Sequence, residues 1–147
     1  MFDLVNQVAL ITGGANGIGK GIVEAFYRAG ATVIVANIDK QNGKQTAKEF
    51  KGAYYHLDVT NKQDIHQTID TIIEDYDKID ILASNTGIFP HEMIEDMTDD
   101  NWDKIMNVNL KSMFHVTQKV LSHMKSRQYG RVIITSSITG PITGYPG

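Results

Sequence analysis

Along this chain, short runs rich in Val, Ile and Thr alternate with longer segments that have helical periodicity. Most of the short runs are apolar throughout, which is typical of strands that helices cover on both faces. Strands that alternate with helices in this way pair in parallel through right-handed crossovers. The order predicts an α/β fold with a doubly wound parallel sheet. Its expected strands are residues 8–12, 32–36, 54–57, 79–84 and 131–135.

The segments between these strands predict helices. The first begins near Ile18 and stops at Gly30. At the start of the third, Thr60 and Gln63 have the spacing of a capping box. At the start of the fourth, two consecutive acidic residues, Asp99 and Asp100, suit the positive end of a helix dipole. The second, third and fourth helices are expected at about 41–50, 61–76 and 98–126.

Size and composition exclude several classes of protein. The 147 residues are the length of one ordinary domain. The net charge is −3 without a long basic block, which argues against nucleic-acid and membrane-surface partners. There is no Cys, no apolar run as long as a membrane span, and an acidic Asp3 where a signal peptide would be basic. The His residues show no metal-ligand spacing. We expect a cytoplasmic protein without a metal site.

A glycine-rich loop joins the first strand to the first helix. Gly13, Gly17 and Gly19 follow Thr12 with the spacing G-x-x-x-G-x-G. Glycine at such positions permits a tight turn, close approach of the backbone to a pyrophosphate, and close packing of helix on strand. The helix that follows offers unpaired N–H groups and a positive dipole end to the phosphates. The loop therefore indicates dinucleotide binding, with a glycine-rich turn that binds nothing as the alternative.

The same loop also matches most of the phosphate-binding loop of nucleoside triphosphatases. That pattern requires Gly14, Gly19 and Lys20 followed by Ser or Thr, whose hydroxyl holds Mg²⁺. Here Gly21 stands at the last position, and no apolar strand ends in the acidic residue that would complete a metal site. We keep a triphosphatase as the less favoured interpretation.

Five separated motifs resemble the short-chain dehydrogenase/reductase family. They are residues 12–19, 58–60, 81–87, 107–109 and 135–137, in the order and at the strand ends typical of that family. The fourth expected strand is followed by a segment that keeps Asn85 and Gly87 of the family's N-N-A-G pattern and departs from it at Ser84 and Thr86. The resemblance implies a Rossmann-like fold and an NAD(P) cofactor. It implies cofactor contacts at Thr12, Gly13, Asn16, Gly17, Ile18, Gly19, Asn37, Asp58, Val59, Asn85 and Gly87.

The resemblance also implies two catalytic residues. Asn109 would support a proton relay through a bound water, and Ser137 would hydrogen-bond the substrate oxygen. Asn109 lies among apolar helix positions, so we expect it to be buried with polar partners or an ordered water. A purely structural Asn fits that position as well. Ser137 follows a strand end, where open α/β sheets place their ligands, although a lone Ser there is more often a cap or a turn.

The family's acid/base Tyr and its Lys lie farther from the catalytic Ser than this chain extends. Gly147 is ten residues past Ser137. We therefore expect residues 1–147 to be the N-terminal part of a single NAD(P)-binding Rossmann-fold domain, truncated after the fifth strand. This part alone should be inactive and prone to aggregate at its open sheet edge. The alternative is a truncated, non-catalytic dinucleotide-binding or vestigial module.

For the parent protein, the resemblance implies an oxidoreductase that interconverts a secondary alcohol and a ketone by hydride transfer. Its partners would be a small-molecule substrate and copies of itself, as a homodimer or homotetramer built partly on the 98–126 helix. Asn37 stands where NAD-preferring relatives usually carry Asp. Because no Lys or Arg precedes Gly17 in the loop or follows Asn37 directly, NAD is favoured over NADP unless Lys40 reaches a 2′-phosphate.

Overall fold

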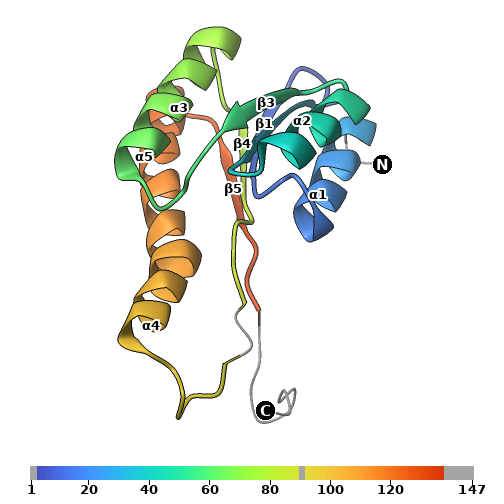
Figure 1. The fold of residues 1–147 in the computed structure, drawn as a ribbon. Helices are drawn as coiled ribbons and strands as arrows, with labels where there is room; N and C mark the ends of the chain where they lie inside the picture. The colour runs from blue at the N-terminus through green and yellow to red at the C-terminus, as the bar shows by residue number, and fades with distance from the viewer. Residues whose placement is uncertain (1–2, 90–91, 138–147) are drawn as a thin grey trace.

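The computed structural model describes residues 3–89 and 92–137. Within these residues, five strands form one parallel sheet in the order β3-β2-β1-β4-β5 (Figure 1). The chain leaves β1 toward β2 on one side and later returns to β4 on the other, so the order reverses between β1 and β4. The strands are β1 (Val8–Thr12), β2 (Thr32–Asn37), β3 (Ala53–His56), β4 (Ile81–Ser84) and β5 (Arg131–Ile134).

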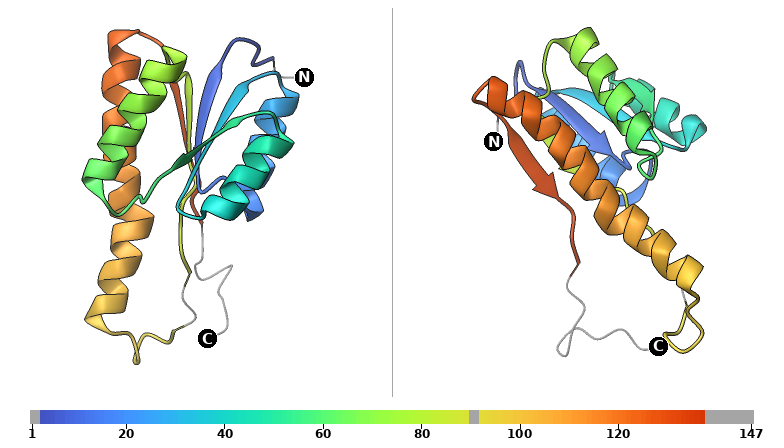
Figure 2. Two further views of the ribbon diagram at one scale, coloured as in Figure 1. Left: turned by 45° about the horizontal axis from the view of Figure 1, so that its top comes forward. Right: turned by 90° about the vertical axis from the view of Figure 1, so that its left-hand side faces the viewer.

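Helices cover both faces of this sheet, which confirms the predicted doubly wound fold. Figure 2 shows α1 and α2 packed on one face, and α3 and α5 on the other. The helices are α1 (Gly17–Arg28), α2 (Lys40–Glu49), α3 (Lys62–Tyr76), α4 (Asp99–Met106) and α5 (Ser112–Ser126). A π-helical turn, Asn107–Lys111, joins α4 to α5 without a break in the helical path.

Alternation along the buried strands divides the core into two layers. Leu10 of β1 faces α3 and α5, where it packs with Ile69 and Val120. Its neighbour Ile11 faces the other way, toward Val23 of α1. All five residues of β1 are buried, as the continuous apolar run predicts for a central parallel strand.

Two local predictions about the helices were wrong or incomplete. The cap of α3 is Asn61, whose Oδ1 accepts hydrogen bonds from the N–H groups of Gln63 at 2.9 Å and Asp64 at 3.2 Å. Thr60 is not a capping-box residue, because its hydroxyl donates instead to Asp58 Oδ1 at 2.7 Å. The helix expected at 98–126 begins and ends where predicted, with Thr98 as its cap, but it contains the π turn.

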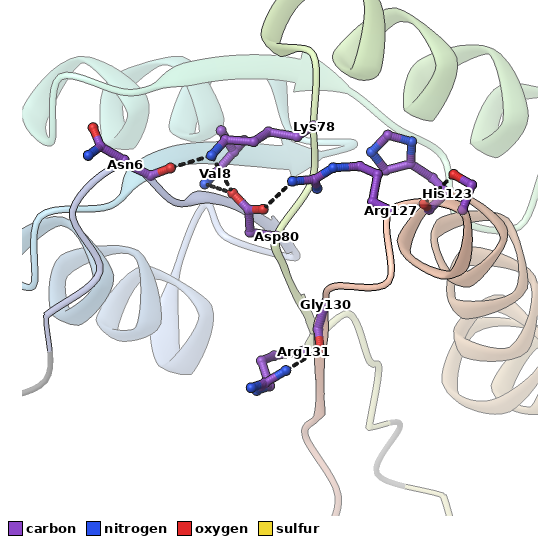
Figure 3. Close-up of polar contacts among 9 residues, drawn as sticks. Asn6, Val8, Lys78, Asp80, His123, Arg127, Gly130 and Arg131 are labelled. Carbon is purple, nitrogen blue, oxygen red and sulfur yellow. Dashed lines mark hydrogen bonds and ion pairs between the residues drawn. The ribbon is translucent and has the colours of Figure 1, made fainter.

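A buried carboxylate ties the amino-terminal edge of the sheet together. Asp80, just before β4, is 2% exposed and accepts a hydrogen bond from the Val8 N–H at 2.9 Å. It also pairs with Lys78 at 3.1 Å and with Arg127 at 3.0 Å (Figure 3). Burial alone would raise the pKa of Asp80, but the Val8 N–H and the two cations outweigh it and hold the pKa below its ordinary value.

Candidate dinucleotide-binding site

The loops at the carboxyl ends of β1 and β4 meet where the strand order reverses, which is the usual ligand position in open α/β sheets. The glycine-rich loop lies there. Gly13 and Gly17 have φ angles of +66° and +54°, a region that disfavours other residues. The Gly13 N–H donates to Ala36 O at 2.9 Å, and the buried Thr46 hydroxyl of α2 donates to Ala15 O at 2.9 Å. The loop is therefore fixed from both β2 and α2.

Gly19 is the position where the loop folds back most tightly. A Cβ atom there would lie 2.1 Å from Gly13 O and 2.7 Å from Asn85 Nδ2. At the start of the helix, Asn16 makes no side-chain cap bond, and Ile18 is 69% exposed. The Asn16 side chain therefore does not occupy the backbone N–H groups of the first turn of α1, which are the groups that an anion at a helix N-terminus uses.

Hydrogen bonds connect the glycine loop to the ends of β4 and β5. Thr12 Oγ1 accepts from the Asn85 N–H at 3.1 Å and from the Thr86 N–H at 3.4 Å. The Asn85 amide donates to Gly13 O at 3.4 Å and accepts from the Thr135 hydroxyl at 2.9 Å. Two motifs 73 residues apart in sequence are thus held together by Asn85 and Thr12.

Beside this loop lies a cavity of about 280 Å³. It is lined by residues at or just after the ends of β2, β3 and β4, and by one residue each of α4 and the π turn. It brings together Asn37, Asp58 and Val59, three of the predicted cofactor residues. Val59 is 7% exposed and forms part of the apolar core under the cavity. The other lining residues are Ile38, Leu57, Thr60, Thr86, Ile88, Lys104 and Val108.

Local hydrogen bonds hold two of the polar side chains of this cavity, Asn37 and Asp58. Asn37 Oδ1 accepts from the Asp39 N–H at 2.8 Å, so its amide nitrogen is left for a ligand. Asp39 in turn caps α2 by accepting from the Asn42 N–H at 3.0 Å, and that backbone bond is the main cause that lowers the pKa of Asp39. Asp58 uses Oδ1 to hold the Thr60 N–H and hydroxyl, at 2.9 and 2.7 Å.

Asn109 has partners, but it is not buried as predicted. Its side chain is exposed at the π turn, and its Nδ2 donates to Ile88 O at 2.8 Å. Its Oδ1 accepts from the Ile88 N–H, also at 2.8 Å. Gly87 lies next to this pair, since a Cβ there would be 3.5 Å from Asn109 Oδ1. Asn109 thus fixes the backbone of a residue that lines the cavity.

Ser137 is exposed and lies three residues past the end of β5 at Ile134. It is on the same edge of the sheet as the glycine loop, because parallel strands end together. Sequence reasoning missed Thr46 and Lys104, and it placed Thr135 in a motif without giving it a role. The spacing of Lys104 four residues before Val108 could have placed both on one helix face. The hydroxyl contacts of Thr46 and Thr135 left no signal in sequence.

Comparison with known proteins identifies the family. The model of the short chain dehydrogenase family matches residues 7–147. The chain belongs to this family. It is 38% identical to the 3-oxoacyl-[acyl-carrier-protein] reductase FabG of Thermotoga maritima, with 98% of this chain and 60% of that protein aligned. It is 36% identical to 3beta-hydroxysteroid dehydrogenase 2 of Eggerthella lenta, with 98% of this chain and 58% of that protein covered.

Solved structures of this family share the fold. The crystal structure of gox2181 superimposes with a TM-score of 0.93 at 32% identity, and covers 98% of this chain and 58% of that one. The chain thus spans about three fifths of the length of the curated relatives it matches.

In the described part of the chain, no helix is both long and apolar enough to cross a bilayer. The described residues also hold no group of three or more His, Asp or Glu side chains placed to bind a metal ion.

Membership of this family implies a nicotinamide dinucleotide, and the residues present fit one. A Cβ at Gly17 would meet no atom within 4 Å, so the backbone there is open to the close approach that a pyrophosphate requires, whereas Gly19 permits the tight packing of the loop on Gly13. Family membership and Gly21, which lacks the hydroxyl that holds Mg²⁺ in a triphosphatase, both disfavour the triphosphatase interpretation. The lysine of that pattern has a surface partner in this structure. Lys20 Nζ pairs with Glu49 Oε2 of α2 at 2.8 Å.

Proposed function

We propose that the protein containing this chain is an NAD(P)-dependent oxidoreductase that interconverts a secondary alcohol and a ketone. One observation carries the proposal: the glycine loop and the cavity lined by Asn37, Asp58 and Val59 lie together at the reversal of the strand order. The family relatives, named as reductases and dehydrogenases, support the same reaction class.

A nicotinamide dinucleotide, when bound, supplies the hydride acceptor or donor. The chain's own residues bind and orient it: the first turn of α1 with Gly13, Gly17 and Gly19 holds the diphosphate. Asp58, two residues past the end of β3, would contact the adenine. Asn37 holds the adenosine ribose through the amide nitrogen that its Asp39 contact leaves available.

Ser137 and Asn109 serve the chemical step. The Ser137 hydroxyl donates a hydrogen bond to the substrate oxygen, where negative charge develops during hydride transfer. Asn109 keeps Ile88 in place through its two 2.8 Å hydrogen bonds and supports the path by which the proton reaches solvent. We assign no acid/base residue within 1–147, because the family's Tyr and Lys lie farther from the catalytic Ser than these residues extend.

The test is an assay of the full-length protein against a panel of secondary alcohols and ketones, with NAD(H) and NADP(H). Ser137→Ala should lower kcat by about 10²–10³, the usual effect of removing one donor to a developing oxyanion. Ser136→Ala removes the neighbouring exposed hydroxyl and is the matched control, expected to change kcat by less than about threefold. Wild-type turnover by Ser137→Ala would exclude Ser137 from the mechanism. Tight nucleotide binding without turnover of any substrate would favour a non-catalytic module.

For the cofactor we infer a preference for NAD. A 2′-phosphate is best held by Arg or Lys, and neither of the two residues that follow Asn37 is one, since they are Ile38 and Asp39; the first cation after it is Lys40, at the start of α2. Lys104 lines the cavity from α4, and not from the turn after β2. The ratio of kcat/KM for the two cofactors tests this, and a tenfold preference for NADP would contradict it.

We also infer that the parent protein forms a homo-oligomer through the long helix. Five large apolar side chains lie along it at least one-third exposed: Trp102, Met106, Leu110, Phe114 and Leu121. An apolar strip of this length is typical of an interface between subunits. Sedimentation equilibrium of the full-length protein measures the state directly, and a monomer at micromolar concentration would contradict the inference.

A further inference from the structure

The π turn between α4 and α5 changes the hydrogen bonding of the helix, and the change can be followed at Ser112. In a regular α-helix the Ser112 N–H would bond to Val108 O, four residues earlier. Here it bonds to Asn107 O, five residues earlier. Such single π turns occur often at functional sites, where they shift side chains around the helix axis.

The Ser112 side chain supplies the missing donor. Its Oγ donates to Val108 O at 2.6 Å, and Ser112 is 4% exposed. A buried carbonyl without a partner would be costly, because water cannot reach it. The hydroxyl thus closes the turn from inside the protein, directly beside Asn109.

The closed turn determines where the next residue points. Asn109 follows Val108 and meets the backbone of Ile88 with both ends of its amide, at 2.8 Å each. Ile88 lines the cavity assigned to the cofactor. If the helix were regular and the π turn absent, Asn109 would be rotated about the helix axis by one residue, about 100°, and would point away from Ile88. The π turn and its hydroxyl bond therefore control a contact that shapes the site.

We propose that Ser112 is a positioning residue of this site: its hydroxyl holds the π turn in the rotation at which the Asn109 amide fixes Ile88. The importance of this for turnover rests on the proposed function. The structural claim does not, because it concerns contacts within the chain.

Hydrogen exchange of the full-length protein tests the claim at one amide, the Ile88 N–H. Ser112→Ala should speed exchange of that amide about tenfold, the effect of losing one buried hydrogen bond next to the contact. Ser112→Thr keeps a hydroxyl that can bond to the same carbonyl, so exchange should stay near the wild-type rate. Ser126→Ala removes a hydroxyl that donates to His123 O at 2.8 Å on the same helix, and should leave Ile88 unchanged.

Three results would overturn the proposal. The first is an unchanged exchange rate of the Ile88 amide in Ser112→Ala. The second is an exchange rate in Ser112→Thr as fast as in Ser112→Ala. The third is an acceleration in Ser112→Ala that is as large at the Leu10 amide of β1 as at the Ile88 amide. The last would mean general loosening of the fold. Turnover is measured on the same samples: a wild-type protein without activity contradicts the proposed function and leaves the exchange result valid.

Discussion

Replacing Asp80 with Asn should destabilise the protein without changing its shape. The substitution keeps the size of the side chain and removes the charge that two cations share, Lys78 at 3.1 Å and Arg127 at 3.0 Å. Breaking a buried ion pair by removing one partner costs about 3–5 kcal/mol. Because the two cations are about a third exposed, they can be hydrated again, and we expect the lower limit of about 3 kcal/mol at pH 7. For a chain of this size class, that lowers Tm by roughly 6–12 °C.

The pKa of Asp80 determines how its contribution to stability changes with pH. The pKa of Asp80 in the folded protein lies below its ordinary value of 3.8. A carboxyl with a lowered pKa stabilises the fold fully above its ordinary pKa and loses that contribution as pH falls through the folded pKa. The Tm difference between wild type and Asp80→Asn should therefore be constant near neutral pH and shrink below about pH 4.

Thermal unfolding followed by circular dichroism over this pH range is the assay. Glu24→Gln is the matched control, since it removes one partner of an exposed pair with Arg28 at 2.6 Å and should cost at most about 0.5 kcal/mol. The reasoning is refuted if Asp80→Asn melts within 2 °C of wild type at pH 7. It is also refuted if the full difference persists at pH 3, because below its ordinary pKa of 3.8 the unfolded chain takes up a proton at Asp80 and the wild type must begin to lose this stabilisation.

Two glycines of α1 give a paired prediction on nucleotide binding. Gly19→Ala should weaken NADH affinity by about 10²-fold, measured by fluorescence titration, because its Cβ would displace Gly13 O from a distance of 2.1 Å and shift the loop by about 1 Å. Gly21→Ala, whose Cβ would meet no atom within 4 Å, should keep that affinity and stabilise the helix by up to about 1 kcal/mol. A third glycine bears on stability: Gly43→Ala would place a Cβ 2.4 Å from the Tyr54 ring and should lower Tm by several degrees. Equal affinities in the two α1 variants, or an unchanged Tm in Gly43→Ala, would contradict these expectations.

The sequence was sufficient to predict which loops meet at the site. All strands of a parallel sheet end at the same edge, so residues that follow successive strands must lie near one another. Asn37 and Asp58 do line one cavity, and Thr12 contacts Asn85 across the strand-order reversal. The roles assigned to these residues in cofactor binding stay predictions.

Contacts that depend on the rotation of a single side chain could not be predicted. Thr60 and Asn61 are adjacent and both suit a helix cap, and only the local backbone decides that Asn61 caps α3. The same limit applies to Asn109. An apolar neighbourhood in sequence predicts burial for a regular helix, but Asn109 lies in a π turn and is exposed. The spacing of apolar residues in the sequence does not reveal a π turn, which adds one residue to a single turn of a long helix.

The amino-terminal edge of the sheet contributes to stability, and the carboxyl-terminal edge carries the candidate binding site. Asp80 holds the Val8 N–H at the start of β1, whereas Thr12 begins the glycine loop at its end. The distance from Val8 to Thr12 is four residue steps of strand, roughly 13 Å at the usual rise. Changes that far apart, with no shared partners, act independently. Asp80→Asn should therefore lower Tm and leave nucleotide affinity intact. The cluster in Figure 3 stabilises the frame on which the opposite edge presents its loops, and takes no part in what those loops bind.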